Sequence, residues 1–465
     1  MIRAHTFQGQ TVAVMGLARS GLASVRSLLA GGARVLAWDD SAICCEEAVS
    51  LGAESTDLGK TNFSGITAMV LSPGIPHTHP APHPVVDRAR AAGVPIIGDI
   101  ELLLRACPDA RVIGITGTNG KSTTTALIGH ILTAAGLPVE VGGNIGRSAL
   151  EFEPMGAEGI FVLELSSYQL QLVPSLACDR AVLLNISPDH LERHGDLAGY
   201  IAAKQRTFDG MPDNGVVVIG DDDAETRTLA GRLATHTVTR ISGLGMPTEG
   251  VGMEGQSVVA MVAGRRKVIG TLSTARALPG SHNAQNACAA TAVALSLGVS
   301  GDVIRAALLD FAGLPHRQEM VGAADGITYV NDSKATNADA AARALSCYDP
   351  IYWIVGGVSK QGGIEPLAPY FPRVRRAFLI GESTEEFAAT LEGRVPYSAC
   401  DTLDRALDAA AVLALSEGRG GATILLSPAS ASFDQFSSYE VRGDCFRDMV
   451  CELLGNGRPC QRRAS

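Results

Sequence analysis

Aromatic residues, long apolar runs and clustered basic residues are all scarce in this sequence. Aromatic side chains make up 5% of the 465 residues, whereas hydrophobic residues reach 46% and glycine occurs 52 times. No uninterrupted apolar run approaches the roughly 18 residues of a membrane-spanning helix, and the first residues lack the apolar segment of an export signal. We therefore expect a cytoplasmic α/β protein with close helix–sheet packing and no membrane insertion.

Charge and cysteine usage argue against two further classes of protein. The 38 Lys and Arg residues are dispersed and are outnumbered by 48 Asp and Glu residues, which gives a net charge of −10. Without a basic stripe, we expect no nucleic-acid partner. The ten cysteines form no C-x-x-C pair and have no metal-like spacing to histidine, so reduced thiols in a cytoplasmic protein are expected.

The length of the chain and its alternating strand and helix patterns predict an α/β protein of three domains. We predict a Rossmann-like domain at 1–98, a central P-loop ATPase-like domain with a mostly parallel sheet at 99–312, and a Rossmann-like C-terminal domain at 313–465. Strands are predicted at 11–15, 34–38, 68–71, 111–115, 159–163, 180–184, 216–219, 327–330, 351–355, 376–380 and 422–426, with a small antiparallel addition at 236–280. Helices are predicted at 22–30, 122–135, 283–297, 302–310 and 338–346.

The segment GITGTNGKSTT, residues 114–124, has the composition of a phosphate-binding loop between a strand and a helix. A strict P-loop reads G-x-x-x-x-G-K-[ST], and here Ile115 replaces the first glycine. The two remaining glycines allow a tight turn whose amides point at one anion near a helix N-terminus. The alternative is an ordinary glycine-rich turn, which does not require Lys-Ser-Thr directly after its last glycine. We predict that the nucleotide is bound by Gly117, Thr118, Asn119, Gly120, Lys121, Ser122 and Thr123, with Mg²⁺ near the Ser122 or Thr123 hydroxyl.

Polar residues follow two predicted central strands, at the edge where open α/β sheets bind ligands. Glu164 comes directly after residues 159–163, and His190 follows residues 180–184. Glu164 is placed as a Mg²⁺ ligand would be, and its alternative role is a helix N-cap. A single loop histidine such as His190 is more often structural than a ligand.

Residues 16–21 form a turn between a predicted strand and a predicted helix in the first domain. The turn approaches the dinucleotide fingerprint G-x-G-x-x-G, but Ala18 stands where the second glycine belongs. An NAD-dependent dehydrogenase is therefore one alternative. The other is that this Rossmann-like domain binds something other than NAD.

Four motifs together resemble the Mur ligase family, which also includes the folylpolyglutamate synthases. They are GTNGKSTT at 117–124, NISPDHLERH at 185–194, GSHNAQNACAA at 280–290, and GLPHR at 313–317 followed by NDSKATN at 331–337. These motifs extend over all three predicted domains. The resemblance implies an ATP-dependent amide ligase, in which ATP phosphorylates a carboxylate and an amine attacks the acyl phosphate.

The resemblance also assigns roles that local patterns do not. It implies two Mg²⁺ sites, one at Ser122 and Glu164 and one at His190 and Lys204, with Lys204 carbamylated by CO2. In isolation, Lys204 lies on an ordinary helix and would be expected at the surface. Further ATP contacts are implied for Asn283, Asn286, Arg317 and Asp332, although Asp332 alone would be taken as an N-cap. The catalytic residues implied by the family are Lys121, His190, Lys204 and Lys334.

Shorter motifs resemble the branch of the family that adds D-glutamate to UDP-N-acetylmuramoyl-L-alanine in peptidoglycan precursor synthesis. They are VMGLARSG, LSPGI, GDIELL, LELSSYQL and LLSPASASFDQFSSYEVRG. The branch implies small-molecule substrates and a monomer. It implies a UDP-substrate site at Gly16, Arg19, Ser20, Asp39, Gly74, Asn144 and Ser166, and an amino-acid site at Thr336, Lys360, Ser432 and Tyr439.

Three positions depart from the branch pattern. Some relatives carry aspartate where Val358 stands and arginine where Ser41 stands, and phenylalanine is common at Tyr439. The sequence leaves open a Mur-type or folylpolyglutamate-synthase-like ligase for another amino acid, and a non-catalytic nucleotide-binding protein. A folylpolyglutamate-synthase-like chain is expected to begin near the P-loop, whereas here about a hundred residues precede that loop.

Overall fold

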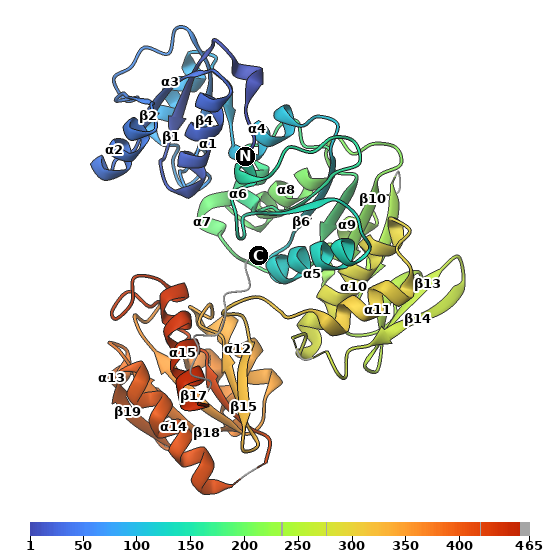
Figure 1. The fold of residues 1–465 in the computed structure, drawn as a ribbon, viewed down its shortest axis with the longest axis vertical. Coiled ribbons are helices and arrows are strands. Elements are labelled where there is room, and N and C mark those ends of the chain that lie inside the picture. Colours follow the sequence, from blue (N-terminus) through green and yellow to red (C-terminus); the bar gives the residue numbers. More distant parts are fainter. Residues whose placement is uncertain (234–235, 276, 419, 456–465) are drawn as a thin grey trace. The chain divides into compact units, whose positions relative to one another are not determined.

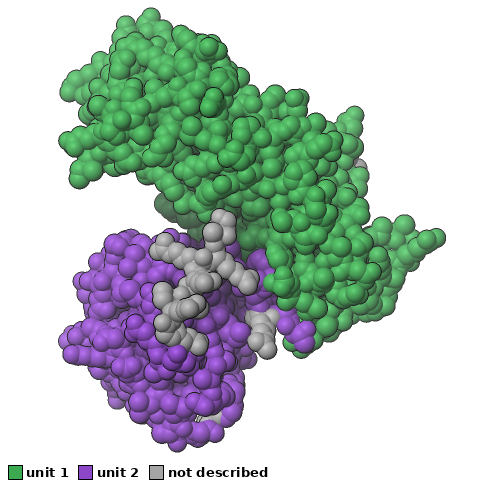
Figure 2. Space-filling view, in the orientation of Figure 1, with its two compact units in different colours: residues 1–273, 283–310 green, residues 274–282, 311–465 purple. Residues whose placement is uncertain are grey.

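The computed structural model describes residues 1–233, 236–275, 277–418 and 420–455, so the last ten residues of the predicted C-terminal domain lie outside the described residues. The chain forms two compact units, coloured separately in Figure 2. Unit 1 comprises Met1–Ser273 and Asn283–Asp310, and unit 2 comprises Thr274–His282 and Phe311–Ser465. The boundary after residue 310 lies two residues from the predicted one. Within the described ranges, no helix has both the length and the hydropathy that crossing a membrane demands.

The first sheet of unit 1 has, in its described residues, five parallel strands in the order β3-β2-β1-β4-β5 (Figure 1). Two of the strands begin and end where the sequence predicts, and the third predicted strand starts two residues earlier, at Ile66. The Rossmann-like order is confirmed. The strands are β1 (Thr11–Met15), β2 (Arg34–Trp38), β3 (Glu54–Ser55), β4 (Ile66–Leu71) and β5 (Ile96–Ile97), and the helices are η1 (His5–Phe7), α1 (Arg19–Ala30), α2 (Ala42–Ser50), α3 (Pro84–Ala91) and α4 (Asp99–Ala106).

The turn between β1 and α1 depends on two glycines. Gly16 has a φ of 87°, which favours glycine, and a side chain there would lie 2.6 Å from the Cβ of Ser72. A Cβ at Gly21 would lie 1.8 Å from the Gly16 carbonyl oxygen. Glycine at both positions therefore lets α1 pack closely against the turn and start at Arg19, three residues before the predicted start.

The second sheet of unit 1 has nine described strands, in the order β14-β13-β12-β11-β10-β9-β6-β8-β7. Its central strands are mostly apolar and, apart from the partly exposed Arg111 and Arg180 at their starts, buried, as expected for a parallel sheet covered on both faces. The strands are β6 (Arg111–Thr116), β7 (Val139–Gly143), β8 (Ile160–Glu164), β9 (Arg180–Leu183), β10 (Val216–Gly220), β11 (Thr237–Ile241), β12 (Gly250–Glu254), β13 (Ser257–Val262) and β14 (Arg265–Thr271).

The prediction of an antiparallel addition at 236–280 is only partly right. Strands β13 and β14 are antiparallel, but β11 pairs in parallel with β10 and with β12. Helix α9 (Ala224–Ala230) provides the crossover that lets β11 run parallel to β10. Residue 276, within the predicted segment, lies outside the described residues.

Helices cover the second sheet and bring several polar residues to its carboxyl edge. The first residues of α10 belong to unit 2 and the rest of this helix to unit 1. The remaining elements of unit 1 are η2 (Ala149–Glu151), η3 (Arg206–Phe208), α5 (Lys121–Ala134), α6 (Ser167–Leu170), α7 (Leu191–His194), α8 (Leu197–Gln205), α10 (Gly280–Ser296) and α11 (Gly301–Asp310).

Unit 2 contains a sheet with six described strands in the order β15-β16-β20-β17-β18-β19. All pairs are parallel except β15 with β16. The four predicted strands are confirmed, and the edge strands β15 and β19 were not predicted. The elements are β15 (Glu319–Ala324), β16 (Ile327–Asn331), β17 (Ile351–Gly356), β18 (Val374–Ile380), β19 (Tyr397–Asp401), β20 (Ala422–Leu426), α12 (Ala338–Cys347), η4 (Glu365–Arg373), α13 (Thr384–Leu391), α14 (Leu403–Glu417) and α15 (Tyr439–Leu453).

Candidate functional site

Residues 117–120 join β6 to α5 and form the predicted phosphate-loop turn. Gly117 has a φ of 152° and Gly120 a φ of 82°, values that side chains disfavour. A Cβ on Gly120 would lie 2.3 Å from Asn286 Oδ1, and one on Gly117 would lie 3.0 Å from Leu184 Cβ. Glycine is thus needed at both positions. The first N–H groups of α5 have no acceptor within their own helix, which makes this turn suitable for an anion.

Two lysine side chains meet at the phosphate loop. Lys121 Nζ donates to Gly117 O and to Thr118 O, both at 2.9 Å. Lys204 Nζ donates to Gly117 O at 2.8 Å and lies 4.5 Å from the centre of the Tyr200 ring. With 1% of its surface exposed, Lys204 is not the surface lysine that local pattern alone predicts. Burial, reinforced by the positive charge of Lys121, lowers the pKa of Lys204 well below its usual value.

Glu164 is the last residue of β8, one position beyond the predicted end of that strand, and it is buried beside the loop. Its Oε1 accepts from Asn144 Nδ2 at 2.9 Å, while Oε2 has no hydrogen-bond partner among the described residues. The capping alternative for Glu164 is wrong, because Ser166 caps α6 and forms a capping box with Gln169. This buried carboxylate oxygen lies on the strand next to β6, which leads into the phosphate loop, and suits Mg²⁺, which prefers oxygen ligands and substrate phosphates.

His190 precedes α7 in a left-handed conformation, with φ 52° and ψ 31°. Its side chain is 47% exposed and its ring centre lies 5.2 Å from that of Tyr168. Asp189 Oδ2 lies 3.5 Å from His190 Nε2. Within the described ranges, no group of three or more His, Cys, Asp and Glu side chains could hold a metal ion. A second Mg²⁺ at His190 would therefore need an added oxygen donor, such as a carbamate on Lys204.

His194 is a neighbouring residue that sequence reasoning did not single out. Its Nε2 lies 2.9 Å from Ser167 Oγ, and its ring stacks on Tyr168 and contacts the ring of Tyr200, with centres 5.5 and 5.4 Å apart. Burial lowers the pKa of His194 to about 4. Tyr200 in turn contacts Thr118 Oγ1 through its hydroxyl at 3.2 Å. This aromatic cluster connects α6, α7 and α8 to the loop, and no local sequence signal reveals it.

The predicted ATP residues of α10 lie beside the helix that follows the loop. Asn286 Oδ1 accepts from Thr124 Oγ1 at 3.1 Å, and Asn286 Nδ2 donates to Asn283 Oδ1 at 3.0 Å. The main-chain N–H of Asn119 donates to Asn185 Oδ1 at 2.9 Å. The Asn119 amide is therefore bound within the protein, and the amides that follow it are the better candidates for phosphate contacts.

Five of the seven predicted UDP-substrate residues lie near the ends of β1, β2 and β4, and the other two, Asn144 and Ser166, follow β7 and β8 of the second sheet. Asp39 Oδ2 accepts from Leu17 N at 2.6 Å, and its Oδ1 accepts from Ser41 N at 2.8 Å. Ser20 Oγ lies 3.5 Å from Ser72 Oγ, next to the turn that contains Gly74. Arg19 is exposed at the start of α1.

Arg193 of α7 joins this edge to the second sheet of unit 1, a role that sequence reasoning missed. Its guanidinium donates to the carbonyl oxygens of Pro73, Gly74 and Ile75 at 3.2, 2.7 and 3.2 Å. The two sheets of unit 1 thus share a hydrogen-bonded contact next to the predicted UDP-substrate turn.

In unit 2, Asp332 is buried at the end of β16. Its Oδ1 accepts from Gln318 N at 3.1 Å and its Oδ2 from Ser427 Oγ at 2.8 Å. Burial raises the pKa of Asp332 to about 7. The capping alternative for Asp332 is wrong, because Asn337 caps α12 by accepting from Ala340 N at 2.8 Å.

The loops of unit 2 that carry the predicted amino-acid residues also follow parallel strands. Lys334 Nζ lies 3.9 Å from the centre of the Tyr439 ring. Ser432 is buried after β20, Thr336 is half-buried, and Lys360 is exposed after β17. The structure therefore brings Lys334 to Tyr439 and leaves Lys360 open to solvent.

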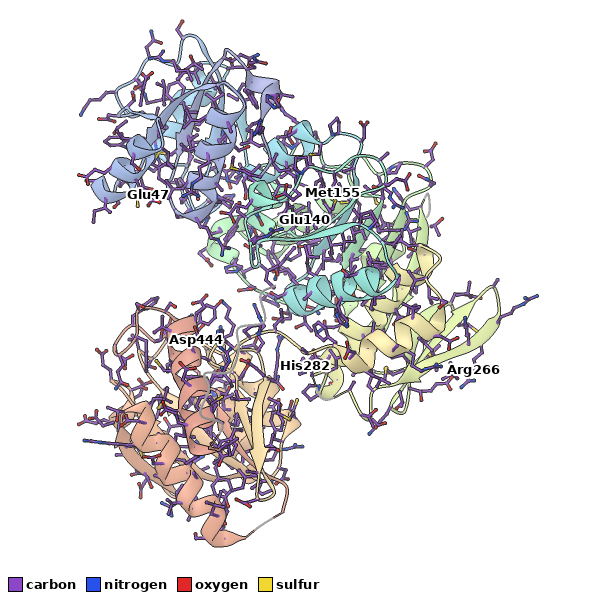
Figure 3. All side chains as sticks on the ribbon, viewed as in Figure 1. Glu47, Glu140, Met155, Arg266, His282 and Asp444 are labelled. Carbon is purple, nitrogen blue, oxygen red and sulfur yellow. The ribbon has the colours of Figure 1, made fainter. Side chains whose placement is uncertain are left out.

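Two buried groups that sequence reasoning missed organise these loops. Arg442 donates to Ser333 Oγ and Ser333 O at 2.9 Å each, and to Ser430 O at 3.1 Å. His316, next to the predicted ATP residue Arg317, contacts Asn331 Nδ2 through Nδ1 at 3.1 Å. Its Nε2 lies 3.8 Å from Oδ1 of Asp444, which is labelled in Figure 3.

Comparisons with known proteins match this chain to one family. The family described as Mur ligase middle domain matches residues 115–294, and the family described as Mur ligase, glutamate ligase domain matches residues 316–430. A Rhodospirillum rubrum protein named UDP-N-acetylmuramoylalanine--D-glutamate ligase is 50% identical over 461 residues, covering 97% of each chain. A Paramagnetospirillum magneticum protein of the same name is 49% identical over 452 residues, covering 97% of this chain and 98% of the relative.

Solved structures of other ligases share the fold. UDP-N-acetylmuramate-alanine ligase from Thermotoga maritima superposes with a TM-score of 0.58 at 17% identity, covering 96% of this chain and 99% of that one. MurF ligase from Thermotoga maritima in complex with ADP gives a TM-score of 0.55 at 18% identity, covering 89% and 92%. At such identities the likeness shows the fold alone, whereas the relatives at about 50% identity show the family. The chain belongs to the Mur ligase family.

Proposed function

We propose that the chain is an ATP-dependent ligase that joins D-glutamate to the alanine carboxylate of UDP-N-acetylmuramoyl-L-alanine in peptidoglycan precursor synthesis. The observation that carries the proposal is the 50% and 49% identity, over almost the whole chain, to proteins named for this reaction. Lys121, the buried Lys204 and the buried carboxylate of Glu164 support it, because they suit a site where a phosphoryl group meets a carboxylate.

The first step transfers a phosphoryl group. A carboxylate oxygen of the UDP substrate attacks the γ-phosphorus of ATP, the bond to the β-phosphate oxygen breaks, and an acyl phosphate and ADP result. The amides at the N-terminus of α5 bind phosphate oxygens, and Lys121 neutralises the charge that develops there. Its ammonium already donates to two loop carbonyls at 2.9 Å, so it is held at the loop before ATP binds.

We assign Mg²⁺ to two groups of residues. Ser122 and Glu164 would hold one ion, for which Glu164 Oε2 is available, since it has no hydrogen-bond partner in the part of the chain that the structure describes. His190 and a carbamylated Lys204 would hold a second. When bound, Mg²⁺ supplies positive charge that screens the phosphates from the reacting carboxylate.

Carbamylation of Lys204 is favoured by its surroundings. The side chain is 1% exposed, and its burial together with the positive charge of Lys121 lowers its pKa well below the usual value. A neutral amine is the form that attacks CO2, so that an N–C bond forms and one proton is released to solvent. The product is a carboxylate-like group that would balance the positive charge of Lys121.

The second step forms the amide. The amine of D-glutamate attacks the acyl carbon, and the tetrahedral intermediate releases phosphate. We assign D-glutamate binding to Thr336, Lys360, Ser432 and Tyr439, charge stabilisation to Lys334, and further ATP contacts to Asn283, Asn286, Arg317 and Asp332. The UDP substrate is assigned to Gly16, Arg19, Ser20, Asp39, Gly74, Asn144 and Ser166.

We propose that three successive parts of the chain bind three different substrates. Residues 1–98 bind the UDP substrate, residues 99–312 bind ATP, and residues 313–465 bind the amino acid. Each of the three described sheets falls within one of these ranges. We propose that the enzyme acts as a monomer in the cytoplasm, where ATP is available.

An isotope experiment tests the acyl phosphate. UDP-N-acetylmuramoyl-L-alanine labelled with ¹⁸O in both carboxylate oxygens is incubated with ATP, Mg²⁺ and D-glutamate, and the released phosphate is analysed by mass spectrometry. One ¹⁸O per phosphate is expected, because the attacking oxygen leaves with the phosphoryl group. Product formed with unlabelled phosphate would contradict this mechanism.

A further inference from the structure

Asn185, which follows β9, forms three hydrogen bonds with the centre of the phosphate loop. Its Oδ1 accepts from Asn119 N at 2.9 Å, and its Nδ2 donates to Asn119 O at 3.2 Å. Its main-chain oxygen accepts from Thr118 N at 2.8 Å. One side-chain amide thus fixes both polar groups of the Asn119 residue, immediately before the Gly120 turn.

Gln285 of α10 extends this contact across the carboxyl edge of the sheet. The side chain is buried, with Oε1 accepting from Asn185 Nδ2 at 2.8 Å. Its Nε2 donates to Asp222 Oδ2 at 2.7 Å. The connected residues come from four separate parts of unit 1, namely the phosphate loop, the end of β9, α10 and the end of β10.

Asp222 fixes which way the side-chain amides of Gln285 and Asn185 are turned. An ionised carboxylate only accepts, and Asp222 accepts from Gln285 Nε2, from Gly243 N at 2.9 Å and from Ser242 Oγ at 2.6 Å. Gln285 must therefore turn its NH2 group to Asp222 and its oxygen to Asn185. Asn185 must then turn its own NH2 group to Gln285, which leaves its oxygen for Asn119 N. Reversing either amide would place two donors face to face.

We propose that Gln285 is a positioning residue for the nucleotide site, acting through Asn185 on the orientation of the Asn119 peptide. The inference rests on the proposed function, because it takes the loop to bind ATP. The amides after Asn119, up to the N-terminus of α5, are those expected to bind phosphate. A loop whose peptide direction is fixed before binding loses less conformational entropy when the nucleotide binds.

The test replaces Gln285 by a side chain of similar size that cannot hydrogen-bond. In the Gln285→Leu variant, the Kd for ADP and the KM for ATP are expected to rise about five- to tenfold, the effect of one lost hydrogen-bonded link. The KM for D-glutamate is expected to stay unchanged. Thr291→Val is the matched control, because Thr291 is buried in the same helix and its hydroxyl has no partner among the described residues.

Two further measurements separate positioning from packing. Hydrogen exchange of the peptide covering residues 117–121 is expected to speed up in Gln285→Leu without nucleotide, and to stay unchanged in Thr291→Val. In an Asn185→Ala background, Gln285→Leu is expected to add no further loss of ADP affinity, since the link to the loop is already broken.

The outcomes distinguish the possible failures. Unchanged ADP affinity and loop exchange in Gln285→Leu would overturn the inference. A fall in Tm together with a higher KM for D-glutamate would make Gln285 a packing residue and would overturn it as well. If the wild-type chain binds no ADP, the proposed function fails, while the exchange comparison still decides whether Gln285 orients the loop.

Discussion

Lys121 and Lys204 donate hydrogen bonds to the same carbonyl oxygen, Gly117 O, at 2.9 and 2.8 Å. Two ammonium groups that share one acceptor repel each other, and the repulsion is strong because Lys204 is buried. A bound phosphate would attract Lys121, and a carbamate would remove the positive charge of Lys204. The geometry therefore suits a site that is completed by ATP and CO2.

Replacing Lys204 tests the carbamate. Lys204→Ala is expected to lower kcat at least about a hundredfold, because charge screening near the phosphates is lost. Acetate or bicarbonate is expected to restore part of the activity, since the shortened side chain leaves room for a small carboxylate. Lys204→Gln is the control, because its side chain fills that space and should not respond to acetate. Phosphate release measured at increasing acetate decides the matter, and full activity of Lys204→Ala without acetate would refute the carbamate.

Glu164→Gln tests the first magnesium site. The variant is expected to fold normally, because the contact with Asn144 is kept and the charge of a buried carboxylate, whose Oε2 has no hydrogen-bond partner among the described residues, is removed. The factor by which Mg²⁺ strengthens ADP binding should then be roughly tenfold smaller than in the wild type. Calorimetric titration of ADP with Mg²⁺ and with EDTA measures this difference.

The matched control for this titration is Glu140→Gln. Glu140, which is labelled in Figure 3, lies on the neighbouring strand β7 and forms an ion pair with Arg147. The same Mg²⁺ enhancement is expected for this control as for the wild type. Equal enhancement in Glu164→Gln would remove Glu164 from the magnesium site.

The sequence predicted the fold well where structure depends on local pattern. Parallel strands are short apolar runs between glycine-rich turns, so β1, β6 and β17 were readily recognised. The direction of β11 was not predicted, because it depends on the crossover through α9 rather than on its own residues. The short strands β3 and β5 of two residues each carry too little pattern to be seen.

The candidate site was predictable only where residues follow one another in a motif. The glycine loop and Lys121 belong to one segment, so their proximity could be inferred from spacing. The burial of Lys204 depends on how α8 packs against the loop, 87 residues away along the chain. Arg442 similarly donates a hydrogen bond to Ser333, which lies 109 residues away along the chain. The family resemblance singled out Lys204, whereas neither the resemblance nor any local pattern singled out Arg442.

Gly443→Ala tests whether His316 holds the neighbouring Arg317 in position for ATP. An added Cβ at position 443 would lie 2.2 Å from His316 Nδ1, so the ring must move and its contact with Asn331 must break. A loss of about 2 kcal/mol in the free energy of unfolding is expected, together with a higher KM for ATP. Urea denaturation and initial rates measure the two effects. Gly420→Ala is the control, since a Cβ there meets no atom of the described residues within 4 Å. Equal behaviour of both variants would contradict this role.

Asp332→Asn tests the buried carboxyl through the pH dependence of stability. The pKa of Asp332 rises from 3.8 to about 7 on folding, so between these values the unfolded chain is ionised while the folded one keeps its proton. Stability is therefore lost as pH rises from about 4 to about 7, by at most on the order of 4 kcal/mol. Asp332→Asn removes this loss, so its stability relative to the wild type should grow over that range. Urea denaturation at several pH values measures it, and a constant difference would contradict the raised pKa.

Phosphate release from ATP tests the central claim most directly. The chain is incubated with Mg²⁺, UDP-N-acetylmuramoyl-L-alanine and one amino acid chosen from D-glutamate, L-glutamate, D-alanine, L-lysine and diaminopimelate. We predict sustained release only when both the UDP substrate and D-glutamate are present. Release that depends on another amino acid would keep the ligase chemistry and overturn the substrate, and no release with any of them would contradict the account.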